Sequence, residues 1–340
     1  MRKINIILIT ILFILSISGS SLAGISKTGT SASKFLNLSI PPRAIAMGGA
    51  FSSICNDASA MYWNVAGIAQ LGKNEVIFTH TNWLADIKIN YAGFVFPLGE
   101  FGNVGVNVTA MTMDDMDETT EFYPEGTGNT FGAGSYAFGL SYGRYLYTNF
   151  MIGVNIKYIS ETISQSSAQG LAIDIGTIFT TPFWGIKFAT SITNFGTKMR
   201  MTGDDLLIKK GLDDTRSGSN DQLDTYLSTD AFELPLRLQI GASRDIILNE
   251  QRLTLAIDAA HPNDNTEYVN IGAELGLLNE MVFLRGGYKT LFIEFPEEGL
   301  TLGGGFNYNK IDGYGLQIDY AFQQMKYLGD LHTFGFIFRF

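Results

Sequence analysis

The chain has 340 residues, of which 46% are hydrophobic and 16% charged, with a net charge of −10 and a pI near 4.8. The acidic balance argues against nucleic acid as a partner, since nucleic-acid-binding proteins need clustered positive charge. The low charged content is unusual for a soluble surface, and a single cysteine, Cys55, excludes an internal disulfide.

The chain begins with a predicted secretory signal peptide over residues 1–23. Arg2 and Lys3 form a positive start, residues 4–17 are nearly all apolar, and Ala23 ends a small-residue cleavage site. The alternative is a membrane anchor, but the apolar run is shorter than the roughly 20 residues that a spanning helix needs. The sequence therefore predicts export.

Residues 24–73 lack strand-like alternation and contain two compact stretches, PPRAIAMGGAF at 41–51 and DASAMYWNVAGIAQLG at 57–72. Asp57 is a predicted N-cap, because its carboxylate can accept the free N–H groups of a first helical turn. The alanines that follow favour helix, and Gly67 lies where the chain must turn. We predict a short helical hatch that fills the lumen formed by the rest of the chain.

From residue 74 onward, apolar residues alternate with small or polar ones. The clearest case is 313–322, where alternate positions hold Tyr314, Leu316, Ile318, Tyr320 and Phe322. The intervening positions hold Gly, Gln, Asp and Ala. Period two with one wholly apolar face is typical of a half-buried strand.

A soluble β-sandwich also alternates, but its second face usually carries Lys, Glu and Thr, whereas here that face is mostly Gly, Ala, Ser and Asn. Aromatic residues also cluster at strand ends, as with Tyr142, Tyr145 and Tyr147. An apolar exterior, a small or polar lumen and aromatic girdles are typical of a transmembrane β-barrel. Lipid cannot satisfy open strand edges, so the sheet must close. The predicted fold class is therefore all-β, a transmembrane antiparallel β-barrel over residues 74–340.

About fourteen strands are predicted, with twelve or sixteen as alternatives. Their ranges are 74–81, 86–97, 101–113, 135–146, 150–163, 167–180, 184–195, 231–244, 251–262, 267–278, 281–291, 299–309, 313–323 and 331–340. Short turns alternate with longer polar loops, as in outer-membrane barrels, whose short turns face the periplasm. An even strand number predicts that both termini are periplasmic, in an outer membrane of the Gram-negative type.

The last predicted strand ends on an aromatic residue. Phe334, Phe336, Phe338 and Phe340 occupy alternate positions. This pattern resembles the signal by which outer-membrane barrels are recognised for assembly, and we assign that role to Phe336, Phe338 and Phe340. The alternative is a strand packed in an ordinary core.

The two compact stretches resemble motifs of the PorV/PorQ family of outer-membrane proteins, part of a wider group of barrels similar to the long-chain fatty-acid transporter FadL. Residues 43–51 match the pattern Arg-Ala-x-x-Met-Gly-Gly-Ala-Phe, and residues 57–67 match Asp-Ala-Ser-Ala-x-Tyr-Trp-Asn-Pro-Ala-Gly. The stretch WLADIKINYAGFVFPLG at 83–99 is similar as well. Val65 stands at the family's proline, so the rigid turn that proline imposes is not assured.

The resemblance implies a fourteen-stranded barrel with an N-terminal hatch whose displacement opens a path. It assigns this gating to Gly48, Gly49, Asp57, Asn64, Ala66 and Gly67. PorV-like proteins are expected to carry exported proteins with a C-terminal signal domain during type IX secretion, whereas FadL-like proteins pass hydrophobic small molecules. We expect the cargo-binding role, with the apolar channel as the alternative, and outer-membrane lipid as a partner in both cases.

Catalysis is poorly supported. The three histidines, His80, His261 and His332, fall on separate strands or strand ends, and none pairs with a nearby Ser/Asp or metal-type cluster. We predict a non-enzymatic protein without cofactor or metal.

Two predicted loops are rich in charged residues. The acidic run at 113–121 lacks the spacing and glycine of an EF-hand type loop, so a solvated acidic loop is favoured over a divalent-cation site. The loop at 203–226 is either a partner-binding surface or a disordered polar segment.

Charged residues also fall on the polar phase of the predicted strands. They are Lys157, Asp174, Lys187, Arg237, Asp258, Glu274, Asp319 and Arg339. Because both signs occur, pairing within the lumen or with the hatch is favoured over an ion-selectivity filter, which would show one sign.

Overall fold

The computed structural model describes residues 29–211, 223–293, 296–311 and 313–340, so the predicted signal peptide lies outside the described residues. Within them, fourteen long strands form one closed antiparallel barrel, which confirms the predicted fold class. The strands are β1 (Glu75–Asn82), β2 (Lys88–Pro97), β3 (Asn103–Thr112), β6 (Ala133–Tyr147), β7 (Phe150–Ile163), β8 (Ser166–Thr180), β9 (Lys187–Gly196), β15 (Arg237–Leu248), β16 (Gln251–Pro262), β17 (Tyr268–Leu277), β18 (Val282–Leu291), β19 (Glu298–Ile311), β20 (Tyr314–Met325) and β21 (Leu331–Arg339). Each strand pairs with the next in this order, and β21 pairs with β1 to close the ring.

Most predicted strand boundaries agree with the structure to within a few residues, and those of β7 and β16 agree at both ends. The boundary predicted for the strand at 231–244 is wrong, because β15 runs from Arg237 to Leu248. Pro235 precedes the strand and has no N–H to donate to a ladder. Ala231–Phe232 (β14) instead pairs with Met199–Arg200 (β10), outside the barrel sheet.

The alternation along each strand separates two environments. In β20, Leu316 and Ile318 are exposed on the outer surface, whereas Gln317, Asp319 and Ala321 are buried on the inner one. An exposed apolar row opposite a buried small or polar row is the arrangement that a barrel in lipid requires.

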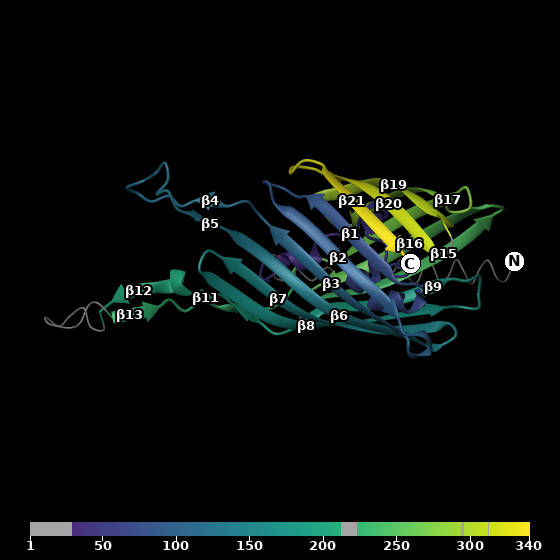
Figure 1. The fold of residues 1–340 in the computed structure, drawn as a ribbon, viewed down its shortest axis with the longest axis horizontal. Helices are drawn as coiled ribbons and strands as arrows, with labels where there is room; N and C mark the ends of the chain where they lie inside the picture. Colours follow the sequence, from purple (N-terminus) through teal and green to yellow (C-terminus); the bar gives the residue numbers. More distant parts are fainter. Residues whose placement is uncertain (1–28, 212–222, 294–295, 312) are drawn as a thin grey trace.

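The two ends of the barrel differ (Figure 1). Short turns at 98–102, 148–149, 181–186, 249–250 and 278–281 lie at the end where the C terminus lies. The opposite end, which we call the mouth, carries the longer loops, from which two hairpins project: β4 (Met116–Asp117) with β5 (Thr130–Phe131), and β12 (Leu207–Lys210) with β13 (Leu223–Tyr226). β11 (Thr202–Gly203) extends the sheet beside β8. Single 3₁₀ turns, η3 (Gly99–Phe101) and η4 (Asp204–Leu206), lie at opposite ends.

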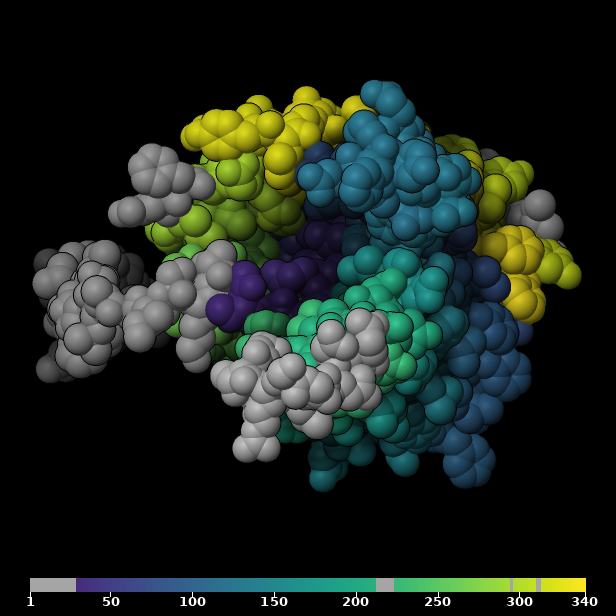
Figure 2. Space-filling model, turned by 90° about the vertical axis from the view of Figure 1, so that its left-hand side faces the viewer, coloured from purple at the N-terminus to yellow at the C-terminus, as the bar shows by residue number. Residues whose placement is uncertain are grey.

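Residues 34–72, which we call the inner segment, lie within the barrel. Figure 2 looks onto the mouth and shows the purple N-terminal residues at the centre of the ring of strands. The helical pieces are short: η1 (Lys34–Asn37), α2 (Pro42–Ala46), α3 (Ala60–Trp63) and η2 (Val65–Gln70). η2 packs against β6, β7 and β8, and α2 packs against β18, β19 and β20, so the segment spans the lumen. No helix in the described part of the chain is long and apolar enough to cross a bilayer.

Candidate functional site

The inner wall of the barrel approaches the inner segment through glycine. A Cβ atom added at Gly153 would fall 2.5 Å from the carbonyl carbon of Val65, and one at Gly303 would fall 2.5 Å from Cβ of Ala46. Wall glycines at which an added Cβ would come within 3.0 Å of the inner segment are Gly93, Gly105, Gly143, Gly153, Gly176, Gly241, Gly272, Gly287, Gly303 and Gly335. The small residues on the inner face therefore allow direct contact between backbone and backbone.

Asn64 joins the inner segment to the wall. Its Nδ2 donates to the carbonyl of Ser52 at 3.0 Å and to the carbonyl of Thr177 on β8 at 3.1 Å. Its Oδ1 accepts the N–H of Ala66 at 3.2 Å, which caps η2. This side-chain cap fixes the turn at Val65, a residue without the ring of proline, because it satisfies an otherwise free N–H of the helix.

The other residues expected to gate the lumen lie in the same buried segment. Gly48 and Gly49 have φ of +65° and +76°, a conformation that glycine adopts readily. Gly67 packs against Cys55, leaving no room for a side chain. Asp57 precedes α3, whose N-cap is Ser59; Asp57 Oδ1 accepts the N–H of Ser59 at 3.0 Å.

Charged side chains connect the segment to the wall in a ring, the lumen network. Arg43 contacts Asp57 (2.9 Å) and Glu274 on β17 (2.9 Å), and Arg285 on β18 contacts both Glu274 (2.7 Å) and Asp319 on β20 (2.6 Å). Each member of the ring contacts the next one. In order, the members are Asp57, Arg43, Glu274, Arg285, Asp319, Gln317, Arg339, Glu75 and the backbone N–H of Ala58. The ring closes there because Ala58 follows Asp57 in the chain. Sequence alternation predicted that Glu274, Asp319 and Arg339 face the lumen. Glu75 and Arg285 follow the same alternation but were not among the predicted lumen charges.

The remaining predicted lumen charges lie elsewhere on the inner wall. Lys157 contacts Asp174 at 2.9 Å, and Lys187 contacts Asp245 at 3.0 Å. Asp258 forms no ion pair with a described residue; its Oδ2 accepts the N–H groups of Phe51 (3.1 Å) and Ser52 (2.9 Å). The guanidinium of Arg237 lies 5.2 Å from the ring centre of Trp63. Opposite charges are therefore neighbours, and no ring of one sign occurs among the described lumen residues.

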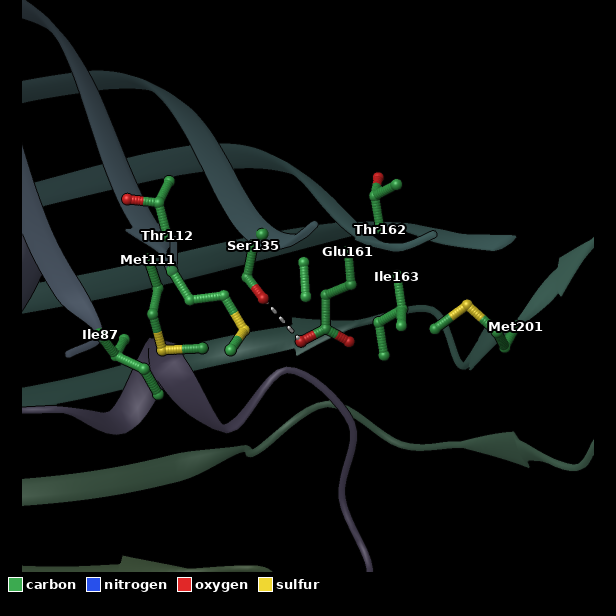
Figure 3. A pocket seen from close by; sticks show the side chains of 11 residues that line it. Ile87, Met111, Thr112, Ser135, Glu161, Thr162, Ile163 and Met201 are labelled. Atoms are coloured by element: carbon green, nitrogen blue, oxygen red, sulfur yellow. Dashed lines mark hydrogen bonds between the residues drawn. The ribbon is translucent and has the colours of Figure 1, made fainter. Parts of the chain in front are cut away.

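A cavity of about 250 Å³ opens at the mouth, and we call it the mouth pocket (Figure 3). It is lined by Ile87, Met111, Thr112, Met113, Ala133, Gly134, Ser135, Glu161, Thr162, Ile163 and Met201. Ser135 and Glu161 point to the same side as Met111, whereas Thr112 and Thr162 point the opposite way (Figure 3). Ser135 donates to Oε1 of Glu161 at 3.4 Å.

Two residues that line the mouth pocket, Met111 and Met201, also pack against an apolar cluster inside the barrel. The cluster contains buried Phe35 and Leu36 of η1 and Ile159 of β7. The hydroxyl of Tyr62 lies within hydrogen-bond distance of the carbonyls of Leu36 (2.9 Å) and Leu38 (2.6 Å), which anchors η1 to α3. The pocket is therefore connected to the inner segment through Met111 and Met201.

The histidines form no joint site. His80 contacts Asn90, His261 contacts Glu267 and His332 contacts the hydroxyl of Tyr320, each at 2.8 Å. Within the described ranges, no group of three or more His, Cys, Asp or Glu side chains is arranged to hold a metal ion.

Both loops of interest fold, where they are described, into hairpins. In the acidic loop, Glu118 Oε2 accepts bonds from Thr127 (3.2 Å) and Asn129 (3.1 Å). In the loop at 203–226, β12 pairs with β13, while residues 212–222 lie outside the described ranges.

The terminal aromatic residues face outward. Phe336, Phe338 and Phe340 are each more than 40% exposed, and Phe338 stacks on Phe340 at 5.5 Å between ring centres and on Tyr314 at 6.0 Å. Phe94 stacks on Phe340 across the point where β1 and β21 close the barrel. Their role in assembly remains a prediction.

Solved structures of similar fold include proteins described as channels and transporters. The chain is similar to the CymD monoaromatic hydrocarbon channel (12% identity, 88% of this chain and 96% of that one, TM-score 0.56). It is also similar to the toluene transporters TodX of Pseudomonas putida (12% identity, 87% and 96%, TM-score 0.56) and TbuX of Ralstonia pickettii (12% identity, 88% and 97%, TM-score 0.53). At such identities the likeness concerns the fold alone.

Sequence comparison gives a different family from the one that the motifs resemble. No curated protein matches the chain. Membership of the PorV/PorQ family is not confirmed, and the model that matches residues 16–198 is that of another family. Because this match covers more than half of the chain, the protein belongs to the uncharacterised protein family UPF0164.

Proposed function

We propose that this protein is an outer-membrane channel that passes small hydrophobic molecules and is closed by its inner segment. The observation that carries the proposal is the mouth pocket, an apolar cavity whose lining residues Met111 and Met201 pack against the cluster that includes η1 of the inner segment. Ligand pockets of this kind are typically apolar with a few polar groups. The FadL-like fold, shared with structures described as hydrocarbon channels and toluene transporters, supports this function over an enzymatic one.

The exterior supports a location in the outer membrane. Exposed apolar side chains follow the outer face of every part of the barrel, and Phe101, Tyr147 and Trp184 are about three-quarters exposed at the short turns. Aromatic residues at both ends of an apolar band are typical of outer-membrane barrels. We orient the short turns and the C terminus toward the periplasm and the mouth toward the outside, as outer-membrane barrels do.

Passage requires movement of the inner segment, which takes the place of the predicted hatch. In the structure η1 belongs to the apolar cluster against which Met111 and Met201 of the mouth pocket pack, and wall glycines bring the barrel into close contact with residues of the inner segment from Pro42 to Ile68. A ligand that binds the pocket and favours a displaced η1 would shift the equilibrium toward an open state, by the difference in its affinity for the two states.

Uptake by whole cells tests this function. The protein is expressed in the outer membrane of a host that lacks its own channel of this kind, and the initial rate of uptake of radiolabelled toluene is measured. Ala133→Trp places a large side chain in the mouth pocket, while Leu140→Trp places the same side chain on the outer face of the same strand, where Leu140 is 57% exposed. We expect uptake to rise with expression, to fall several-fold for A133W and to be unchanged for L140W. Uptake equal to that of the empty host would contradict the proposal.

The cargo-binding role in secretion remains a prediction from the motif resemblance. The fold comparison favours the apolar channel, since the similar structures are described as channels and transporters of small molecules. Recovery of exported proteins with a common C-terminal domain, in a pulldown from native membranes, is the result that would favour secretion instead.

A further inference from the structure

We infer that the mouth pocket selects small apolar molecules that carry a protonated amine at one end, and disfavours those that end in a carboxylate. This inference rests on the proposed function, because it names the class of molecule that the same pocket would take. It depends on three features: the position and few partners of the Glu161 carboxylate, the charges around the pocket and the side chains of its wall.

The position of Glu161 is fixed by strand register. Met111 on β3 is paired with Ser135 on β6, and Ser135 is paired with Glu161 on β7, so the three side chains form one row across the inner face. In β7 the residue two positions earlier, Ile159, is fully buried, which places Glu161 on the same inward phase. The carboxylate thus lies at the upper edge of the lumen, with the apolar cluster below it.

Glu161 differs from the other carboxylates of the inner wall. Asp174, Glu274 and Asp319 each form an ion pair with Lys or Arg, and Asp258 accepts two backbone N–H groups. Glu161 has no ion pair with a described residue, and its hydrogen bond comes from Ser135 at 3.4 Å, near the long limit for such a bond. A carboxylate with this little compensation in a cavity has most of its accepting capacity available to a ligand.

Charges of both signs adjoin the lining residues, and the carboxylates outnumber the cations Lys88 and Arg200. Asp114 follows Met113, and a Cβ added at Gly132, next to Ala133, would fall 2.9 Å from Oδ1 of Asp115. Lys88, the cation next to Ile87, is already paired with Asp114 at 2.8 Å. A ligand carboxylate would therefore be repelled by the Glu161 carboxylate, which has no ion pair with a described residue, whereas an ammonium group would be attracted to it.

The remaining wall favours an aromatic or short aliphatic body. Met111, Met113 and Met201 contribute thioether sulfur, which packs favourably against aromatic rings and adapts to irregular shapes. The cavity volume is about 250 Å³. Since an apolar cavity of roughly 150 Å³ holds benzene, the pocket has room for a benzene ring and a short amine-bearing arm that reaches Glu161.

Binding of three matched ligands to the detergent-solubilised full-length protein tests the inference. The probes are 2-phenylethylamine, ethylbenzene and phenylacetate, which share a ring and differ in the end group, and affinity is measured by calorimetry. We expect the amine to bind about tenfold tighter than ethylbenzene, as a charge-assisted hydrogen bond provides, and phenylacetate to bind more weakly than either. Glu161→Gln should remove the advantage of the amine and leave ethylbenzene unchanged.

Two further variants separate the effect of the charge at Glu161 from the effect of the net charge of the protein. Glu161→Lys should reverse the order, so that phenylacetate binds more tightly than the amine. Glu118→Gln removes one negative charge from the projecting β4–β5 hairpin and should leave all three affinities unchanged, which controls for net charge. Correct folding of each variant is checked by its shift on an unheated gel relative to a heated one.

The outcomes distinguish the two proposals. If the amine and ethylbenzene bind equally, if phenylacetate binds most tightly, or if E161Q leaves the amine's advantage intact, the amine selectivity is overturned while the apolar channel stands. If none of the three probes binds, or if A133W does not weaken binding of ethylbenzene, the mouth pocket is not a ligand site and the proposed function loses its main support.

Discussion

Arg43 and Glu274 form a two-point ion pair inside the barrel, with 2.9 Å between Nε and Oε2 and 3.1 Å between Nη2 and Oε1. Arg43 belongs to the inner segment and Glu274 to β17, so the pair joins the segment that would move in the proposed opening to the barrel wall. The side chain of Glu274 is completely buried, and Arg252 (2.9 Å) and Arg285 also contact it. Displacing the inner segment therefore requires Arg43 to leave one of the most strongly held carboxylates in the molecule.

Glu274→Gln should weaken the closed state. Loss of the charge leaves three arginines around a neutral amide, and breaking a buried ion pair typically costs about 3 kcal/mol or more. We expect a lower midpoint of urea unfolding in detergent. Glu233→Gln serves as the control, because Glu233 and its partner Lys198 are both mostly exposed, and a surface ion pair contributes about 1 kcal/mol at most. Equal midpoints for E274Q and the wild type would contradict a structural role of the lumen network.

Cys55 reports the position of the inner segment. It is the one cysteine of the chain and is fully buried, and burial together with nearby Asp57 and Asp258 raises the pKa of its thiol. The folded protein should therefore remain unreactive toward a maleimide from pH 7 to pH 9, whereas the unfolded chain should react faster as pH rises toward the ordinary thiol pKa near 8.5. The raised pKa also affects the free energy of unfolding. The thiol of the unfolded chain loses its proton at a lower pH than the thiol of the folded protein, so folding stability falls as pH rises above about 8.5.

Rapid labelling of Cys55 in native membranes would show that the inner segment opens often. In E274Q we expect the labelling rate to rise, because labelling follows the population of displaced segments. In E233Q the rate should equal that of the wild type.

The barrel could be predicted from the sequence because its determinants are local and periodic. The lipid face of β20 requires Leu316 and Ile318 at alternate positions, and this pattern is readable in a single segment. The exception, the start of β15, depends on which partner Ala231 and Phe232 find in another loop, which no local pattern encodes. Alternation thus specifies strands better than it specifies their ends.

The site was less predictable because it depends on distant segments meeting. The alternation along the strands predicted that Glu274 and Asp319 face the lumen. Arg285 contacts both of them because its strand, β18, lies beside β17, which carries Glu274, and is separated from β20, which carries Asp319, by β19 alone. Glu161 lies near the end of a strand with an unremarkable local sequence, and its pocket forms from residues on five separate stretches of chain. The row that joins it to Met111 becomes visible only once strand register is known.

Gly272 should be intolerant of a side chain, whereas Gly276 on the same strand and the same inner face should accept one. A Cβ at Gly272 would overlap the backbone carbonyl of Met47, while at Gly276 the nearest atom lies 3.4 Å away, in the ring of Phe283. Gly272→Ala should therefore push α2 from the wall and raise the labelling rate of Cys55, while Gly276→Ala should not. Barrel assembly, measured by resistance to unfolding on an unheated gel, should survive in both. Equal labelling of the two variants would mean that the glycine contacts do not hold the segment.

Removal of Phe340 should reduce the amount of assembled barrel. Its ring stacks on Phe338 and on Phe94 at the strand pair that closes the barrel, and it ends the row of outward aromatic residues. We expect a stop codon at this position to lower the yield in the outer membrane several-fold, measured by fractionation and an unheated gel. Phe292, which is 86% exposed in a mouth loop, provides a control whose change to Ala should leave the yield unchanged.

Deletion of residues 41–72 should leave a barrel that inserts but leaks. The strands pair with one another along their whole length and close through β1 and β21 without help from these residues, so the backbone hydrogen bonds of the wall remain satisfied. Glu274 loses Arg43 but keeps Arg252 and Arg285. Asp258 loses the N–H groups of Phe51 and Ser52, but it would face a lumen that water can enter, which greatly reduces the cost of losing these partners. Swelling of proteoliposomes in an isotonic sugar solution measures the leak, and the wild type provides the closed reference. Swelling of the deletion variant at the wild-type rate, with insertion verified, would mean that the inner segment does not close the lumen.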